Sequence, residues 1–255
     1  MPRRNLTADN KAIYERSVAV MMIFPDIYLL SGTAYGLHQN IYGIDCPEEN
    51  SLVLIDCGLD EKDLAVIEKT MERFGLEDRK ITDVFITHSH FDHSGNAAEL
   101  ERQGVTVHIG EYDAESIRTG DTGTIAFAYG RRFPTVSQPD EVADGESYMI
   151  PGAEIIAHHT PGHSKGSVCY ELRKDGRKIL FTGDFLQIDP TGEVIPGIKV
   201  DPAYDYDEYL ASAAAIRDLD IDAMLCGHYQ PVLSSPTVHV GRLYRQMLVN
   251  RNEYM

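Results

Sequence analysis

Basic residues are scarce in this sequence of 255 residues: Lys and Arg total 23 against 40 Asp and Glu, a formal net charge of −17. Nucleic acids and anionic membranes are held by basic surface, so this balance argues against a general polyanion-binding protein. The apolar run over residues 18–30 is interrupted by Pro25 and Asp26 and is shorter than the roughly 20 residues that span a bilayer. We therefore expect neither nucleic acid nor a membrane as a partner, although the acidity by itself names no substrate.

Cysteine is also rare, with four residues and no C-x-x-C pair: Cys46, Cys57, Cys169 and Cys226. This number and spacing fit neither a disulfide scaffold nor a thiolate zinc site. We expect reduced, mostly buried thiols in a cytoplasmic protein. The polar stretch 5–16 follows the first residues where an export signal would have its apolar core, which indicates the same location.

The remaining composition is that of an ordinary globular protein, with 43% hydrophobic and 25% charged residues. Because no repeat or long linker is visible, we expect one domain over residues 1–255. Short apolar runs predict strands at 18–24, 27–30, 40–44, 51–56, 81–87, 105–109, 154–157, 167–173, 178–182 and 223–226. Periodic apolar residues predict helices from Asp60 to Gly75, over 94–103 and 205–219, and around 240–247. These elements favour an α/β layered domain, although periodicity does not give the strand order.

The predicted strand 81–87 is followed by a dense group of ligand-type residues, His88-Ser89-His90-Phe91-Asp92-His93. In an extended stretch, His88, His90 and Asp92 would project to one side, and His93 would point elsewhere. That arrangement suits two metal ions side by side better than one tetrahedral ion. Isolated histidines are commonly structural, but three with an aspartate in H-x-H-x-D-H order indicate a metal site.

Three later segments repeat one pattern, a glycine directly before a ligand-type residue at the end of a strand-like run. These pairs are Gly162-His163, Gly183-Asp184 and Gly227-His228. Glycine permits a sharp turn that presents the next side chain outward. The set as a whole therefore predicts one metal centre built from distant parts of the chain.

These motifs resemble those of the metallo-β-lactamase superfamily, binuclear metallohydrolases with a four-layer αββα sandwich. The resemblance runs from Ile55-Asp56-Cys57-Gly58, through H-x-H-x-D-H, to Gly227-His228. It implies that His88, His90 and His163 hold a first metal, and that Asp92, His93 and His228 hold a second. Asp184 would bridge the two ions, and Asp56 would support the ligand loop from behind without binding metal.

The other histidines match no ligand position and are expected to be structural, although His38 could face the pocket; they are His38, His108, His158, His159 and His239. Cys226 lies two residues before His228, but Asp184 fills the bridging position. We therefore do not expect Cys226 to be a ligand.

The electrostatics of such a centre suit hydrolysis. Two divalent ions, with Asp92, Asp184 and a bridging hydroxide, leave a residual charge of about +1. A water between the ions would lose a proton near neutral pH, and the same charge would stabilise an oxyanion. We expect Asp92 and Asp184 to be catalytic in this sense. Imidazole and carboxylate ligands suit zinc, with iron or manganese as alternatives.

Several positions of this chain differ from the motifs of particular branches of the family, and these differences disfavour some branches. Glyoxalase II-type enzymes usually have a histidine where Ser89 stands and add a helical glutathione-binding region, for which the 27 residues after His228 are too few. Lactonases of the acyl-homoserine lactone type often have a tyrosine at the place of Gln187. Nucleases of this superfamily act on polyanions and usually have a basic recognition surface, so a chain with a net charge of −17 is a poor candidate for that branch. Class B β-lactamases fit poorly because they are normally exported and lack this full second-metal set.

Non-hydrolytic members form the main alternative. The diiron flavoprotein type has a glutamate in the ligand run, where this chain has His90. Persulfide dioxygenases keep much of the motif with one iron and remain open, and a non-catalytic metal-binding protein is disfavoured by the complete ligand set. We expect hydrolysis of a small ester, thioester or lactone. The irregular segment 110–144 is either part of the pocket wall, through Tyr112, Phe127, Tyr129, Arg131, Arg132 and Phe133, or an ordinary solvated loop.

Overall fold

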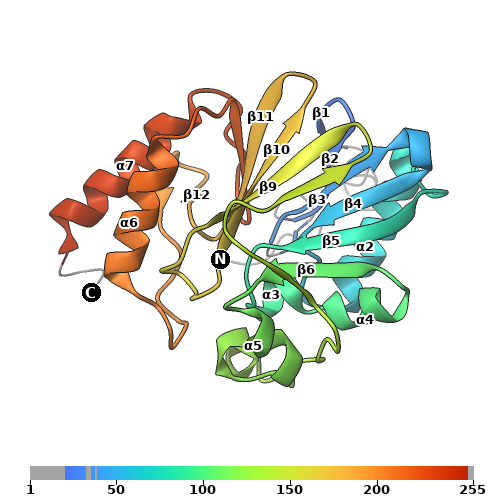
Figure 1. The fold of residues 1–255 in the computed structure, drawn as a ribbon, viewed down its shortest axis with the longest axis horizontal. Helices are drawn as coiled ribbons and strands as arrows, with labels where there is room; N and C mark the ends of the chain where they lie inside the picture. Colours follow the sequence, from blue (N-terminus) through green and yellow to red (C-terminus); the bar gives the residue numbers. More distant parts are fainter. Residues whose placement is uncertain (1–20, 33–35, 38, 252–255) are drawn as a thin grey trace, which may run out of the picture.

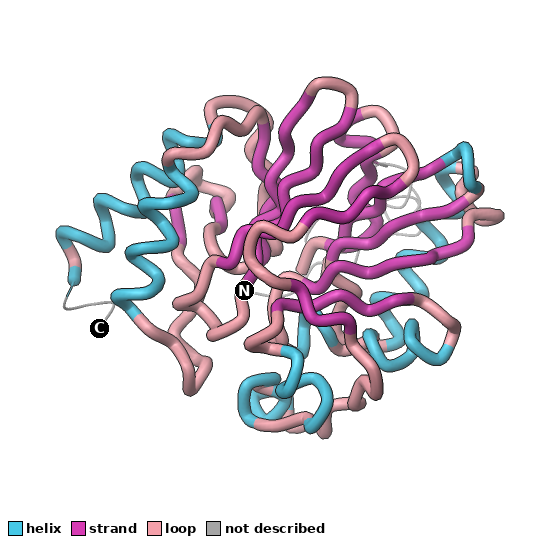
Figure 2. Tube along the Cα trace, viewed as in Figure 1, coloured by secondary structure: helices cyan, strands magenta, loops and turns pink. Residues whose placement is uncertain are grey.

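The structure is a computed structural model that describes residues 21–32, 36–37 and 39–251. Two β-sheets pack face to face in the middle of the molecule, and helices cover both outer faces (Figure 1; strands and helices are separated by colour in Figure 2). The predicted four-layer αββα sandwich in a single domain is therefore confirmed. None of the helices in the described part of the chain is long and apolar enough to cross a membrane.

The first sheet has seven strands in sequential order, β1 Met21–Phe24, β2 Ile27–Ser31, β3 Ile41–Cys46, β4 Ser51–Ile55, β5 Lys80–Ile86, β6 Thr106–Gly110 and β7 Asp140–Val142. The second sheet has the order β14-β11-β10-β9-β8, with β8 Ser147–Ile150, β9 Ala153–His159, β10 Val168–Lys174, β11 Arg177–Gly183 and β14 Ala223–Cys226. A two-stranded ribbon joins β12 Gln187–Ile188 to β13 Val194–Ile195.

Parallel pairing places the candidate ligands at one edge of the sandwich. Strand β4 runs parallel to β5, and β11 runs parallel to β14. The carboxyl ends of parallel neighbours meet at the same edge of a sheet, where α/β proteins build their binding sites. The segments that follow these strands contain Asp56, His88–His93, Asp184 and His228.

The helices lie in two groups, one on each outer face. The first sheet is covered by α2 Glu61–Phe74, α3 Phe91–Ser94, α4 Ala97–Arg102 and α5 Ala114–Thr119, and the second by α6 Tyr206–Arg217 and α7 Pro236–Val249. Short 3₁₀ turns occur at Pro47–Glu49, Thr122–Thr124 and Ala126–Tyr129. The core between the sheets includes Phe85 against Tyr170, with ring centroids 5.3 Å apart.

The long helices begin and end where the sequence predicts. Asp60 caps α2 through a capping box, and Gly75 ends it in a left-handed conformation. Asp205 caps α6 by accepting from the Glu208 amide at 2.9 Å. Strands β10 and β11 pair antiparallel as a hairpin across Asp175-Gly176. Residues 18–20 of the first predicted strand lie outside the described residues.

The helix expected over 94–103 is wrong at its beginning, because the chain forms two short helices, α3 and α4, instead. A Cβ atom on Gly95 would lie 2.3 Å from the Leu59 carbonyl oxygen, so the backbone passes very close to its neighbour there. The Asn96 side chain then donates to the carbonyl oxygens of Cys57 and Asp60 at 2.8 and 2.9 Å. These contacts fix the break between the two helices.

Candidate metal centre

Seven side chains from distant segments converge at the carboxyl edge of the two sheets. Their potential ligand atoms form three groups, within each of which all atoms lie within 4.8 Å of one another. The groups are His88–His90–His163, His88–His93–Asp184 and Asp92–His93–His228. The structure thus brings together every residue of the predicted ligand set. Six of the seven are buried, and the His228 side chain is 15% exposed.

The ligand run after β5 is only partly extended. His90 has φ −58° and ψ 142°, but the next residues form the helical turn α3. The expectation that Asp92 projects with His88 and His90 by strand alternation is therefore wrong. Asp92 and His93 are adjacent on a helical turn instead, and both reach His228. The change from extended to helical backbone therefore places His88 and His90 in the first group and Asp92 and His93 in the second.

The glycines before the other three candidate ligands differ in their role. Gly162 and Gly183 have φ values of +130° and +49°, a region that side-chain-bearing residues rarely adopt. Gly227 is needed for space, because a Cβ atom there would lie 2.8 Å from both the Gly183 carbonyl carbon and His93 Cε1. The predicted sharp turns are confirmed at the first two positions.

The facing atoms of the cluster fit metal ligation. His90 Nδ1 lies 3.1 Å from His163 Nε2, and His93 Nε2 lies 3.3 Å from His228 Nε2. His88 Nε2 is buried without a hydrogen-bond partner, which is costly unless a bound group satisfies it. Several nitrogen lone pairs converging on shared points are well satisfied by cations.

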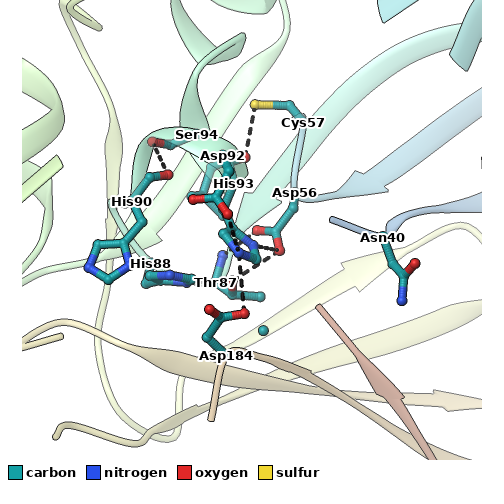
Figure 3. Close-up of polar contacts among 12 residues, drawn as sticks. Asn40, Asp56, Cys57, Thr87, His88, His90, Asp92, His93, Ser94 and Asp184 are labelled. Atoms are coloured by element: carbon teal, nitrogen blue, oxygen red, sulfur yellow. Dashed lines mark hydrogen bonds and ion pairs between the residues drawn. The ribbon is translucent and has the colours of Figure 1, made fainter. Parts of the chain in front are cut away.

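Asp184 lies between the two groups. Its Oδ1 is 3.3 Å from His93 Nε2 and 3.1 Å from His228 Nε2, while its Oδ2 is 3.6 Å from His163 Nε2. Figure 3 shows His93 between this carboxylate and Asp56. One carboxylate that faces both groups has the placement of a bridging ligand. The donor set therefore fits two divalent cations, and the ligand roles of the individual residues stay predictions.

The far sides of the His93 and His88 rings are also held by hydrogen bonds. His93 Nδ1 lies 2.8 Å from Asp56 Oδ2, and His88 Nδ1 lies 3.0 Å from Thr87 Oγ1. Asp56 in turn accepts from the Thr87 amide at 2.8 Å and from the Thr87 hydroxyl at 3.0 Å. Such partners fix the ring orientation and leave the opposite nitrogen free to bind metal. The predicted contact of Asp56 with the back of the ligand loop is present.

Two buried carboxylates near the first group were missed by sequence reasoning. Asp201 Oδ2 lies 2.9 Å from His90 Nε2, on the side of the ring away from His163. Asp113 accepts from the Ser89 amide and the Ser164 hydroxyl through Oδ2, and from the Gly166 amide through Oδ1, at 2.7–2.9 Å. Asp113 thus joins the two loops that bear His90 and His163. Both are single aspartates in irregular segments, which no sequence motif distinguishes.

Without a metal, the electrostatics of the two groups differ. Burial, reinforced by neighbouring histidines, lowers the pKa of His88 and lowers that of His163 to about 3, so these rings are neutral. Burial also acts on His93 and His228, but the Asp184 and Asp92 carboxylates outweigh it and raise their pKa values. Protons therefore occupy, in part, the positions that cations would take in the second group.

A cavity of about 200 Å³ opens above the cluster, lined by His90, Asp92, Ile125, Tyr129, Asp184, Gln187, Ile198, His228 and Tyr229. Burial and the neighbouring Asp92 carboxylate raise the pKa of Tyr129, so its hydroxyl stays protonated at neutral pH. Of the aromatic and basic residues considered for the wall, Tyr129 lines this cavity. Phe133 packs in the core instead, and Arg131 pairs with Asp60 at 2.8 Å.

Three of the remaining histidines, His108, His158 and His159, have contacts of a structural kind. His108 lies between Asp140 and Asp83, at 2.7 and 3.0 Å, and stacks on Phe85. His158 contacts Glu171 at 2.9 Å, and His159 contacts the Lys165 carbonyl oxygen at 3.0 Å. His239 lies on α7. His38 is outside the described residues.

The prediction of buried thiols without a disulfide is confirmed, whereas the prediction that Cys226 binds no metal stays a prediction. All four cysteines are buried and unpaired with one another, and Cys226 belongs to none of the metal-binding groups found among the described residues.

The family-level comparison agrees with this geometry. A family model described as the metallo-beta-lactamase superfamily matches residues 34–228, which is most of the chain and includes every residue of the cluster. The chain belongs to the metallo-beta-lactamase superfamily. The resemblance inferred from the motifs is thereby confirmed.

Named relatives in this superfamily are hydrolases. The chain is 31% identical over 235 residues to acyl-coenzyme A thioesterase MBLAC2 from Homo sapiens, covering 82% of this chain and 77% of that protein. It is 30% identical over 179 residues to a hydroxyacylglutathione hydrolase from Rhizobium meliloti (strain 1021), covering 68% of this chain and 55% of the other. The predicted enzyme class, a metal-binding hydrolase of the metallo-β-lactamase fold, is confirmed.

Solved structures agree with the fold. The metallo-beta-lactamase family protein TTHA1429 from Thermus thermophilus superposes with a TM-score of 0.73 at 21% identity, covering 89% of this chain and 81% of that one. At this identity the likeness concerns the fold alone.

Proposed function

We propose that this superfamily member hydrolyses a small ester, thioester or lactone with two divalent ions, zinc by default and iron or manganese as alternatives. The observation that carries the proposal is the pair of three-residue groups, His88–His90–His163 and Asp92–His93–His228, which the Asp184 carboxylate faces from one side each, beside one cavity. When bound, two such ions supply a water of lowered pKa and polarise the substrate carbonyl. The products are a carboxylic acid and a thiol or alcohol, or a hydroxy acid from a lactone.

The residues divide into two ligand groups and their supports. His88, His90 and His163 would hold the first ion, Asp92, His93 and His228 the second, and Asp184 would face both. Asp56, Thr87 and Asp201 keep three of the histidine rings in their ligating orientation. The Tyr129 hydroxyl and the Gln187 side chain line the cavity and can hydrogen-bond to a substrate there.

The names of the relatives support an acyl substrate. One is named for the hydrolysis of acyl-coenzyme A and another for that of hydroxyacylglutathione. Both reactions release an acyl group from a sulfur carrier. A one-iron dioxygenase explains the cluster less well, because it gives the second group, Asp92, His93 and His228, no metal to hold.

A small substrate also fits the charge and shape of the cavity better than a polynucleotide. The described residues that line it include neither lysine nor arginine, and the chain has a net charge of −17. Repulsion of a long polyanion acts over roughly 10 Å at 0.1 M salt. We also retain a cytoplasmic location as a prediction, in keeping with four buried thiols that form no disulfide.

The test is a substrate panel with metal-loaded protein. We expect hydrolysis of small esters, thioesters or lactones with little salt dependence, and poor cleavage of structured RNA and duplex DNA at physiological salt. His90→Ala is the control that identifies activity belonging to this centre. Efficient nucleic-acid cleavage that disappears in His90→Ala would replace the small-substrate proposal with a nuclease.

A further inference from the structure

The cavity above the candidate ligands is also lined by large apolar and aromatic side chains, which we call its apolar wall. Four side chains form it: Ile125, Tyr129, Ile198 and Tyr229. Ile198 is 62% exposed and Tyr229 is 38% exposed, so neither is placed there to fill the protein core. Besides the candidate ligands, the polar groups of the described lining are the Gln187 amide and the hydroxyls of Tyr129 and Tyr229. Apolar walls with few polar groups are typical of pockets that bind small organic ligands.

Two of these four wall residues have an unfavourable backbone conformation. Among the described residues, seven other than glycine have positive φ values: Asp26, Asn50, Asp56, Ile125, Asp175, Tyr229 and Ser235. Five of them are Asp, Asn or Ser, and the two apolar or aromatic ones both line this cavity. For β-branched Ile125, a φ of 47° is a clear outlier, because its Cβ crowds the backbone.

The surroundings hold both residues in place. The Ile125 amide donates to the Thr122 carbonyl oxygen at 3.1 Å, and the Ala128 amide donates to the Ile125 carbonyl oxygen at 2.9 Å. The Tyr229 carbonyl oxygen accepts from the Asn40 side chain at 3.1 Å. Backbone strain that the rest of the fold maintains occurs preferentially at ligand contacts. Two strained residues on one wall therefore point to a contact surface for a ligand.

The charge of the cavity shows which part of a substrate this wall suits. Its charged lining residues are candidate metal ligands, and no described lining residue is a lysine or an arginine. Carrier thiols such as glutathione or coenzyme A bear carboxylate or phosphate groups, which need basic partners. An uncharged acyl chain needs none, and it gains by leaving water.

We propose that Ile125, Tyr129, Ile198 and Tyr229 form an acyl-binding wall that makes the enzyme selective for apolar, uncharged acyl groups. This inference rests on the proposed function, since it assigns the acyl side of a thioester or ester to the cavity. The charged carrier then extends outward to solvent. Selectivity arises from these residues, whereas bond cleavage arises from the metal centre.

The experiment compares acyl thioesters that share one uncharged leaving group, N-acetylcysteamine, in the metal-loaded enzyme. Acetyl, butanoyl and hexanoyl groups vary length, and succinyl adds a carboxylate. We expect kcat/KM to rise about two- to fourfold per methylene from acetyl to hexanoyl, because each buried methylene favours binding by that order. The succinyl thioester should be hydrolysed at least about tenfold more slowly than the hexanoyl thioester.

A matched pair of variants locates the effect. Ile198→Ser removes an exposed wall residue, so the fold should be retained, and the hexanoyl-to-acetyl ratio of kcat/KM should fall about fivefold. Met149→Ser removes a similarly exposed apolar side chain on β8, away from the cavity, and should leave that ratio unchanged. An equal ratio in Ile198→Ser and the parent enzyme would overturn the proposal.

Calorimetric binding of acetate and hexanoate to the metal-loaded protein separates this proposal from the proposed function. If no ester or thioester is hydrolysed but hexanoate binds more tightly than acetate, the wall is supported and the hydrolase assignment fails. Hydrolysis without chain-length preference would reject the wall and keep the hydrolase. Equal binding of both acids in an inactive protein would reject both.

Discussion

Asp184→Asn is expected to lower turnover by at least about a hundredfold and to weaken metal binding. The amide keeps the size of the carboxylate but loses the negative charge that faces both ligand groups. Asp184 is 6% exposed, and its two oxygens approach His93, His163 and His228. In the metal-free protein, the positive charge of His228 and His93 outweighs burial and holds the pKa of Asp184 well below its usual value.

The measurement is kcat/KM on the best substrate of the panel, together with metal content after dialysis against a weak chelator. Asp218→Asn is a matched control, because that carboxylate is 70% exposed and pairs with neighbouring Arg217. Both quantities should be unchanged in the control. Native activity and metal content in Asp184→Asn would show that this residue does not bridge the two ions.

The second large effect is expected from Asp56→Ala. The Asp56 carboxylate is buried and accepts from the Thr87 amide, the Thr87 hydroxyl and His93 Nδ1. Its removal leaves these donors without an acceptor and leaves a charged His93 buried without this carboxylate. The free energy of unfolding should therefore fall by about 3–5 kcal/mol. Asp56 also has a φ of 59°, which alanine tolerates less well. Asp56→Asn should cost less, because asparagine adopts this conformation and keeps the shape.

Denaturant unfolding of the metal-free protein measures this loss, and chelator competition measures metal affinity. Asp56 contacts His93 directly and His88 through Thr87, so its loss should lower the affinity for both ions. Asp201→Asn provides the contrast, because Asp201 contacts His90 alone among the ligand rings. This substitution should lower the affinity for the first ion by roughly 10- to 100-fold. A change in unfolding free energy below about 1 kcal/mol for Asp56→Ala would contradict the support role.

The sequence predicts the main strands and the long helices because their signals are local. Helix α2 has its cap at Asp60, its apolar face and its terminating Gly75 within one continuous segment. Strands β12 and β13 have two residues each, and β7 has three, which is too short for any alternation to be recognised. The parallel pairing of β11 with β14 depends on contacts between distant segments, so periodicity could not indicate it.

The ligand set is predictable for a similar reason. Four of the seven residues are close together after β5, and each of the others follows a glycine at a strand end. Asp201 contacts His90 across 111 positions, from a segment without a recognisable motif. The left-handed conformation of Ile125 could not be predicted from the sequence either, because isoleucine is not a residue that indicates such a conformation. Residues that act through tertiary contacts alone therefore appear only in the structure.

Metal titration of the chelator-stripped protein tests the central claim most directly. Hydrolysis of the best ester or thioester should be followed as zinc is added, with bound metal measured in the same samples. We expect activity and bound metal to reach a plateau near two ions per chain, because the Asp184 carboxylate faces two three-residue ligand groups. A plateau at one ion, with iron required and oxygen consumed during turnover, would contradict the binuclear hydrolase and favour the dioxygenase.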